Sequence, residues 1–167
     1  MLKKNILSLL GAAALLSSAA LAATATANIT PSATVTATCV VTGNPMPFGA
    51  YNPFTGAAVL HSTTISVTCT TGMTPPPITM DQGLHPGTSS TVAVPLRQLS
   101  NGAAGLLTYN LYSDEGSTVV WEGTTGVTSP TPTGSAINMD VFGKIDAGQT
   151  TVPAGTYNDT VIVTATF

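Results

Sequence analysis

The stretch ATATANITPSATVTATCVV, residues 23 to 41, alternates strictly between two kinds of residue. Its even positions from Thr24 to Thr38 are all Thr, Asn or Ser, while its odd positions are apolar or at least not hydrophilic. A two-residue period predicts an extended segment with one buried face and one solvated face. Strands usually run about 5 to 6 residues, so this segment is several times too long for one ordinary strand.

Shorter strand patterns follow along the rest of the chain, separated by clusters of Gly, Pro, Asn, Asp and Ser. This spacing is typical of a β-sandwich. No stretch after residue 22 shows a convincing helical period, and the Thr-rich, Gly-rich and Pro-rich composition opposes long helices. We therefore predict a single all-β sandwich domain, with strands over residues 61–69, 78–81, 92–99, 106–113, 118–121, 136–143 and 157–167.

The last of these strands, in YNDTVIVTATF, carries an apolar, uncharged face made of Val161, Val163, Ala165 and Phe167. The sequence stops on this strand, so we expect no later strand to pair with it. An exposed apolar strand edge invites another chain to add a strand. The sequence thus predicts a spare strand at one end and an uncovered strand at the other.

The first 22 residues, MLKKNILSLLGAAALLSSAALA, have the features of a secretory signal peptide. Lys3 and Lys4 precede a short apolar run, which ends in small residues that fit a cleavage site. The run is short for a transmembrane anchor, and no stop-transfer charges follow it. We expect export with cleavage of residues 1–22.

The part of the chain after the signal has few charges. Arg97 and Lys144 stand against seven acidic residues, which gives a formal charge of −5. Such a chain cannot hold a phosphate backbone by counterion release, so we expect no nucleic acid partner. For the same reason we do not expect an anionic membrane surface as a partner.

The chain has two cysteines, Cys39 and Cys69. An exported chain with an even number of cysteines is expected to pair them. Closing a 30-residue loop stabilises a fold by about 3 to 4 kcal/mol in the chain-entropy model, less any strain. A redox-active pair is more often Cys-x-x-Cys, so this bridge is predicted to be structural.

The sequence holds little catalytic potential. There are two histidines, His61 and His85, and no serine lies in a G-x-S-x-G turn, so a hydrolytic triad has few residues to draw on. Carboxylates for glycoside chemistry meet in space and leave no sequence signal, and no pair is nominated here. We predict that the protein is not an enzyme and uses no cofactor.

A blue-copper site is the one metal hypothesis that the residues suggest, because His61, Cys69, Met73 and His85 are all present. Such a site needs two histidines and a thiolate, with one histidine normally between the Cys and the Met. No histidine lies between Cys69 and Met73. The site would also leave Cys39 unpaired in an oxidising compartment, so we expect no metal.

Several motifs occur in a fixed order: PFGAY (47–51), ISVTCTTG (65–72), ITMDQG (78–83), Arg97 before LLTYNLYSDE (106–115), VVWEG (119–123), VFGKIDAGQ (141–149) and GTYNDTVIVTATF (155–167). In this order and with this cysteine spacing, the chain resembles the spore coat protein U domain, found in Csu-type, or archaic, chaperone-usher pilins of Gram-negative bacteria. The resemblance covers essentially all of the chain after the signal. Gln98-Leu99 departs from the family, which often has a methionine near the arginine.

The resemblance implies an incomplete immunoglobulin-like β-sandwich, over residues 37–167, that lacks its final strand. A periplasmic chaperone first lends a strand to the open groove. In the family, an outer-membrane usher then exchanges the chaperone's strand for the N-terminal extension of the next subunit. The alternation of the leader independently suggests the same β-strand addition.

Residues 23–36 would then be the donor segment, and Cys39 would lie in the protein's own first strand. The donor face would consist of Ala27, Ile29, Ala33 and Val35, and the acceptor groove of Val161, Val163, Ala165 and Phe167. Other pilin subunits, the chaperone and the usher would be the partners, first in the periplasm and then at the cell surface. The alternative for residues 23–36 is a flexible N-terminus.

Three classes of function remain open at this point. The first is a structural subunit of a surface pilus or fimbria that supports adhesion and biofilm formation. The second is a spore or cyst coat protein, or a single-domain adhesin, of the same fold. The third is the cupredoxin. Trp121, the only tryptophan, is predicted to be a core residue and not a sugar platform.

Overall fold

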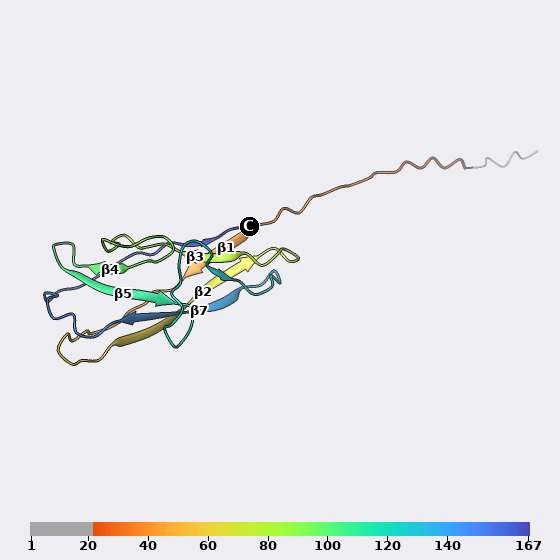
Figure 1. Cartoon of the computed structure of the whole chain (residues 1–167). Helices are drawn as coiled ribbons and strands as arrows, with labels where there is room; N and C mark the ends of the chain where they lie inside the picture. Colours follow the sequence, from red (N-terminus) through yellow and green to blue (C-terminus); the bar gives the residue numbers. More distant parts are fainter. Residues whose placement is uncertain (1–21) are drawn as a thin grey trace, which may run out of the picture. The chain divides into compact units, whose positions relative to one another are not determined.

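The computed structural model describes residues 22–167, and the elements in this range are all strands (Figure 1). In chain order they are β1 (Cys39–Gly43), β2 (Val59–Cys69), β3 (Pro77–Met80), β4 (Arg97–Ser100), β5 (Leu106–Tyr112), β6 (Val127–Thr128), β7 (Ile137–Ile145) and β8 (Val163–Ala165). One sheet has the order β1-β2-β7-β5-β4, and the other has the order β6-β3-β8. The predicted all-β, immunoglobulin-like sandwich is confirmed.

The described chain divides into two units. Residues 22–34 form an extended segment without regular secondary structure, and Val35–Phe167 forms the compact body. Over residues 22–167, no helix is long and apolar enough to cross a membrane. The predicted signal peptide, apart from residue 22, lies outside the described residues.

The long antiparallel pair of β2 and β7 is the centre of the larger sheet. Its register runs from Val59 opposite Ile145 to Val67 opposite Ile137. Ile65 and Val67 are both 3% exposed, while Thr64, Ser66 and Thr68 on the other face are half-buried. This is the alternation that the sequence predicted, and it buries one face of β2 against the second sheet.

Trp121 lies in the core between the two sheets. It is 1% exposed, and its indole N–H donates to the main-chain carbonyl of Ile78 at 2.8 Å. Its own main-chain N–H donates to the carbonyl of Leu111 at 2.9 Å. Trp121 therefore links the smaller sheet to the larger one, which confirms its prediction as a core residue.

Three predicted strands are shorter than expected. The segment 92–99 becomes regular only at Arg97, after Pro95, which has no N–H to donate. The segment 118–121 forms a single bridge, between Val120 and Tyr112. The segment 157–167 is regular only over Val163–Ala165, because the chain moves from one sheet to the other before that point.

The predicted disulfide is present. Cys39 and Cys69 lie opposite each other in the β1 and β2 register, and their sulfurs are 2.02 Å apart. Next to the bridge, the N–H of Thr70 donates to the carbonyl of Thr38 at 3.0 Å. The bridge therefore fixes the start of β1, where the extended segment joins the body.

Removal of this bridge is expected to weaken the body without changing its topology. A Cys39→Ala/Cys69→Ala variant should lose about 3 to 4 kcal/mol of unfolding free energy, since a 30-residue loop is released in the unfolded chain. Urea denaturation measures this loss. In the parent protein, thiol labelling of the unreduced, denatured chain should find no free thiol; two labelled cysteines would contradict the bridge.

Candidate functional site

The last strand has hydrogen-bond partners on one side only. The N–H of Asp81 donates to the carbonyl of Ile162 at 3.1 Å, and the N–H of Thr166 donates to the carbonyl of Pro77 at 3.3 Å. Main-chain groups point alternately to the two sides of a strand. The main-chain groups of the odd-numbered residues in this last strand therefore point away from β3. In its sheet β8 is the last strand in the order. We call residues 159–165 the open edge.

The side chains of the open edge are only partly covered. Val161, Val163 and Ala165 pack against the buried core but keep part of their surface in solvent. Phe167 is 62% exposed. These are the four residues predicted to form an acceptor groove; the structure places three on the core-facing side of one strand and Phe167 just beyond it.

A cleft of about 1120 Å³ opens beside the segment that leads into this edge. Residues 45–54 form one wall and residues 152–159 form the other. Leu99, Leu107 and Ile145 also line it. We call this the wide end of the cleft. The four predicted groove residues do not line this cleft, and their role as an acceptor groove stays a prediction. The wall at residues 45–54 was not predicted from the sequence.

β1 continues into the first wall of the cleft and β8 follows the second, and we call the space between these two strands the narrow end. Cα atoms of these two strands come within 8 Å of each other, and Figure 1 shows the C-terminus beside the start of β1. A strand inserted between two others needs about twice the usual spacing of ~4.8 Å, or roughly 9.6 Å. β1 and β8 are therefore closer together than a strand paired between them would require.

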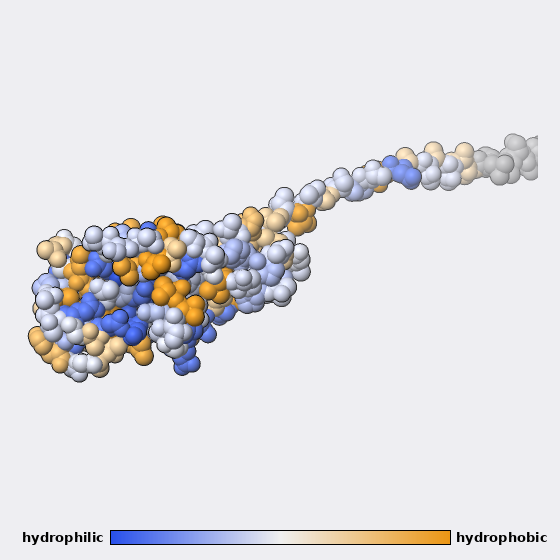
Figure 2. All heavy atoms as spheres, in the orientation of Figure 1, coloured by the Kyte–Doolittle hydropathy of each residue, from blue (hydrophilic) through white to orange (hydrophobic). Residues whose placement is uncertain are grey.

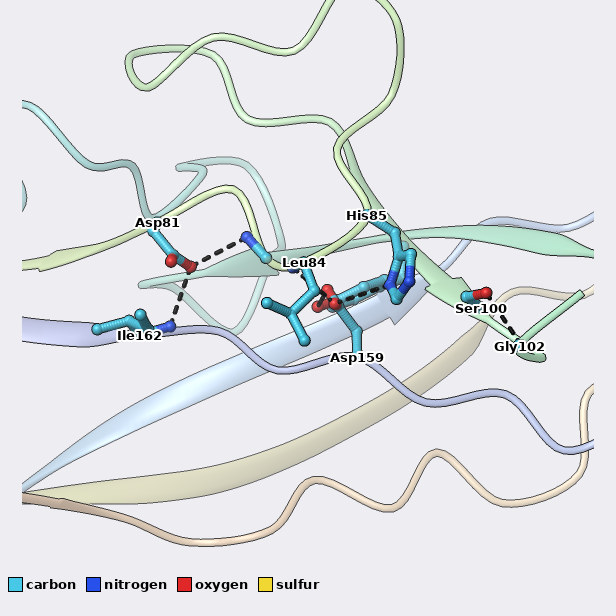
Figure 3. A network of polar contacts seen from close by, with 9 residues as sticks. Asp81, Leu84, His85, Ser100, Gly102, Asp159 and Ile162 are labelled. Carbon is cyan, nitrogen blue, oxygen red and sulfur yellow. Dashed lines mark hydrogen bonds and ion pairs between the residues drawn. The ribbon is translucent and has the colours of Figure 1, made fainter.

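Two carboxylates hold the chain where it crosses from the larger sheet to the smaller one (Figure 3). Oδ1 of Asp81 accepts the main-chain N–H of Ile162 at 2.9 Å, in the role of a strand carbonyl. The side chain of Asp159 is 1% exposed; it accepts the N–H of Leu84 and the hydroxyl of Tyr109, at 2.9 Å and 2.7 Å. The open edge is therefore held by side chains at the place where regular strand pairing is lost.

Arg97 is fully buried behind these carboxylates. Its guanidinium donates to the main-chain carbonyls of Asp81 at 2.8 Å, Met80 at 3.2 Å and Trp121 at 2.7 Å, and to Oδ1 of Asn110 at 2.7 Å. A buried charge is costly unless its donors are paired. With these four hydrogen bonds Arg97 links β3 and the Trp121 segment to β4 and β5. The sequence alone did not indicate this role.

Burial shifts the pKa values of two residues in this cluster, Arg97 and Tyr109. It lowers the pKa of Arg97, while Tyr109, Asp81 and Asp159 act in the opposite direction. Burial also raises the pKa of Tyr109, and the hydrogen bond to Asp159 raises it further. Tyr109 therefore stays a protonated donor to Asp159 at all physiological pH values, and the cluster is a structural feature and not an acid–base pair.

The residues considered for copper do not form a site. Cys69 is oxidised in the bridge to Cys39, so its sulfur is not a thiolate ligand. His85 lies beside the carboxylate of Asp159, with Nδ1 3.5 Å from Oδ1, and His61 lies on β2. Across residues 22–167, no group of three or more His, Cys, Asp or Glu residues is arranged to hold a metal ion.

The fold and this edge together define an immunoglobulin-like sandwich whose last strand lacks a neighbour on one side. Residues 23–164 match the Spore Coat Protein U domain family, and the chain belongs to this family. Its members are structural proteins and not enzymes, as the sequence predicted.

Two known proteins are similar to this chain. The chain is 39% identical to Protein U of Myxococcus xanthus over 132 residues, which cover 75% of this chain and 73% of Protein U. It also resembles a solved complex of a chaperone with a tip adhesion subunit, from the archaic chaperone-usher Csu pili of Acinetobacter baumannii. That match has a TM-score of 0.57 and 23% identity, and it covers 80% of this chain and 40% of the solved one.

The Asp81 contact is expected to stabilise the open edge measurably. Asp81→Ala leaves the N–H of Ile162 without its acceptor, so the free energy of unfolding should fall by about 1 to 3 kcal/mol. Urea denaturation measures the change. Asp140→Ala, which removes an exposed carboxylate from β7, is the control and should stay within about 0.5 kcal/mol. Equal losses for the two variants would contradict the assigned role.

Proposed function

We propose that this protein is a structural subunit of a surface pilus or fimbria, in which each subunit is completed by a strand from its neighbour. The open edge supports this function most directly. Its outward main-chain groups are paired with no described strand, and its apolar side chains are half-covered. An added strand would form hydrogen bonds with these main-chain groups and bury these apolar side chains.

The donor would be the leader, residues 23–36, of another copy. Residues 22–37 have no regular secondary structure and are exposed, and Figure 2 shows hydrophobic residues at intervals along the extended segment. Ile29 is 88% exposed and Val35 is 84% exposed. With Ala27 and Ala33 they form the proposed donor face, and the open edge with Phe167 forms the proposed acceptor.

The proposed route of assembly follows from the uncovered edge. A subunit with an open apolar edge needs a strand from a periplasmic chaperone until its neighbour is available, and an outer-membrane usher would exchange the two. The similar solved complex, which pairs a chaperone with a pilus subunit, supports a chaperone partner. The predicted signal at residues 1–22 fits export to the periplasm and then to the cell surface, where a fibre would serve adhesion and biofilm formation.

Assembly into a spore or cyst coat is the second candidate function. The match to Protein U and the name of the family favour it. The same strand addition would operate in both cases, so the two functions differ in the shape of the assembly and not in the site.

A leader copy supplied in the same chain should stabilise the body. We expect that fusing residues 23–36 after Phe167 through a short Gly-Ser linker raises the free energy of unfolding. Covering about 200 Å² of apolar surface corresponds to about 5 kcal/mol before the entropy of ordering is subtracted. Denaturant unfolding measures the gain. No gain from the fused leader would mean that the sandwich is already complete. A fused leader of the same composition but shuffled order is the control; an equal gain from it would mean that the order of the leader's side chains does not matter.

Loss of the leader should stop assembly but not folding. A chain without Ala23–Thr34 keeps Cys39 and every strand, so it should oxidise normally and form no polymer. Ile29→Asp should weaken polymer formation less than the deletion, because one buried carboxylate costs several kcal/mol while the main-chain ladder persists. Thr30→Asp, on the opposite face, is its matched control.

The assay is high-mass, denaturant-resistant polymer at the cell surface, with electron microscopy to separate fibres from coat-like layers. Normal polymer from the deleted chain would show that the leader is only a tail.

A further inference from the structure

Phe54 is an exposed aromatic residue at the rim of the wide end. It is 80% exposed and lines the cleft. Its turn is fixed, since the N–H of Phe54 donates to Oδ1 of Asn52 at 3.0 Å and the N–H of Thr55 donates to the carbonyl of Asn52 at 3.4 Å. Pro53 further restricts the backbone. A rigidly presented aromatic side chain in solvent has the properties of an interface anchor.

The two walls of the cleft differ in what they offer to an added strand. The wall at residues 45–54 contains Pro45, Pro47 and Pro53, which have no N–H to donate. The opposite side, residues 157–165, alternates regularly and carries the open edge. The main-chain ladder of a donor therefore forms with the open edge, and antiparallel pairing is the more stable arrangement there.

This direction fixes where the donor leaves the cleft. A strand antiparallel to the open edge begins near Phe167, at the narrow end, and finishes at the wide end. Only three residues, 36–38, separate Val35 from Cys39, the first residue of the donor's own body. The Cα atoms of Val35 and Cys39 are thus four residue steps apart, which an extended chain spans in about 13 to 14 Å. The body of the donor copy must therefore lie against the rim that carries Phe54.

The surface beside Cys39 of the donor copy is the part that arrives at this rim. There the turn after β2 begins with Thr70, which is hydrogen-bonded to Thr38, and Thr71 and Gly72 in this turn are exposed. This surface carries no charged residue over 70–77, so an aromatic side chain can pack on it without desolvating a charge.

From these constraints we infer a second contact between consecutive subunits, beyond the donor strand. Phe54 of the acceptor copy packs against the turn of residues 70–74 of the copy that donates the strand. The inference rests on the proposed function, because the donor strand sets the position of the second body. The contact limits how the two bodies turn about residues 36–38, so it gives the fibre bending stiffness.

A tandem chain tests this contact. Two copies of residues 23–167 are joined in series by a short Gly-Ser linker, and residues 23–36 are fused after the second Phe167. The leader of the second copy can then fill the first cleft and continue into the second body. The second cleft receives a leader with no body behind it, so the two Phe54 positions serve as test and control within one molecule.

Phe54→Ser in the first copy should lower the guanidinium midpoint of the tandem and increase its maximum dimension in solution X-ray scattering. The same substitution in the second copy should change neither, because that side chain faces solvent. Leu60→Ser, which removes a 64% exposed leucine from β2, should change neither the midpoint nor the maximum dimension in either copy.

Equal changes in the guanidinium midpoint from the two Phe54 substitutions would mean that Phe54 contacts the donor strand alone. No change from either substitution would mean that Phe54 contacts neither the donor strand nor the second body. Either result overturns the second contact and leaves strand addition intact. If the unaltered tandem resists guanidinium no better than a chain without a fused leader, strand addition itself fails, and the second contact fails with it.

Discussion

The unpaired side of the last strand is the feature on which the rest of this molecule depends. A buried or half-buried main-chain group without a partner costs about as much as a lost hydrogen bond. Here a row of such groups borders apolar side chains that are packed on one face only. A monomer can reduce this cost by burying the edge, by charging it or by bending it away. The open edge carries a charged residue only at Asp159, and that carboxylate is turned inward.

The remainder of the body compensates for this missing neighbour. The β2 and β7 pair is fully formed over nine positions, and the disulfide anchors β1 to it. On the other side, Arg97, Asp81 and Asp159 supply the bonds that regular pairing would have made at the crossing between sheets. These interactions keep the last strand in place while leaving its outer side free, which a flexible C-terminal segment could not do.

Much of this architecture could be predicted from the sequence, because an alternation of apolar and polar residues indicates a strand with one buried face. The strand over residues 61–69 was predicted on that basis, Trp121 was predicted to be a core residue, and the cysteine count predicted the bridge. The wide end of the cleft was missed, since its wall at residues 45–54 is irregular and proline-rich and gives no period to detect. Only the apolar run PMPFGAY hinted at a buried role.

The polar cluster escaped prediction for a different reason. Arg97, Asp81 and Asp159 are far apart in the sequence, and each has a main-chain partner that depends on where the chain crosses between sheets. Propensity and pattern carry no information about such contacts. The lone Arg97 was visible in an almost uncharged chain, but its burial could be known only once β3, β4 and β5 were placed around it.

Strand addition alone gives little selectivity, because main-chain hydrogen bonds are the same for every sequence. Selectivity has to come from side chains, and the proposed donor has mostly small ones, with Pro31 also lacking an N–H. Such a donor fills a cleft of about 1120 Å³ only in part. The preference for the correct neighbour must then depend on the few bulky donor residues, Ile29 and Val35, and on contacts between the two bodies. The short tether of residues 36–38 favours contacts between the two bodies, since it would bring the second body to the rim at high effective concentration. In the proposed fibre the permissive ladder and the rim contact would thus act together, one supplying affinity and the other supplying orientation.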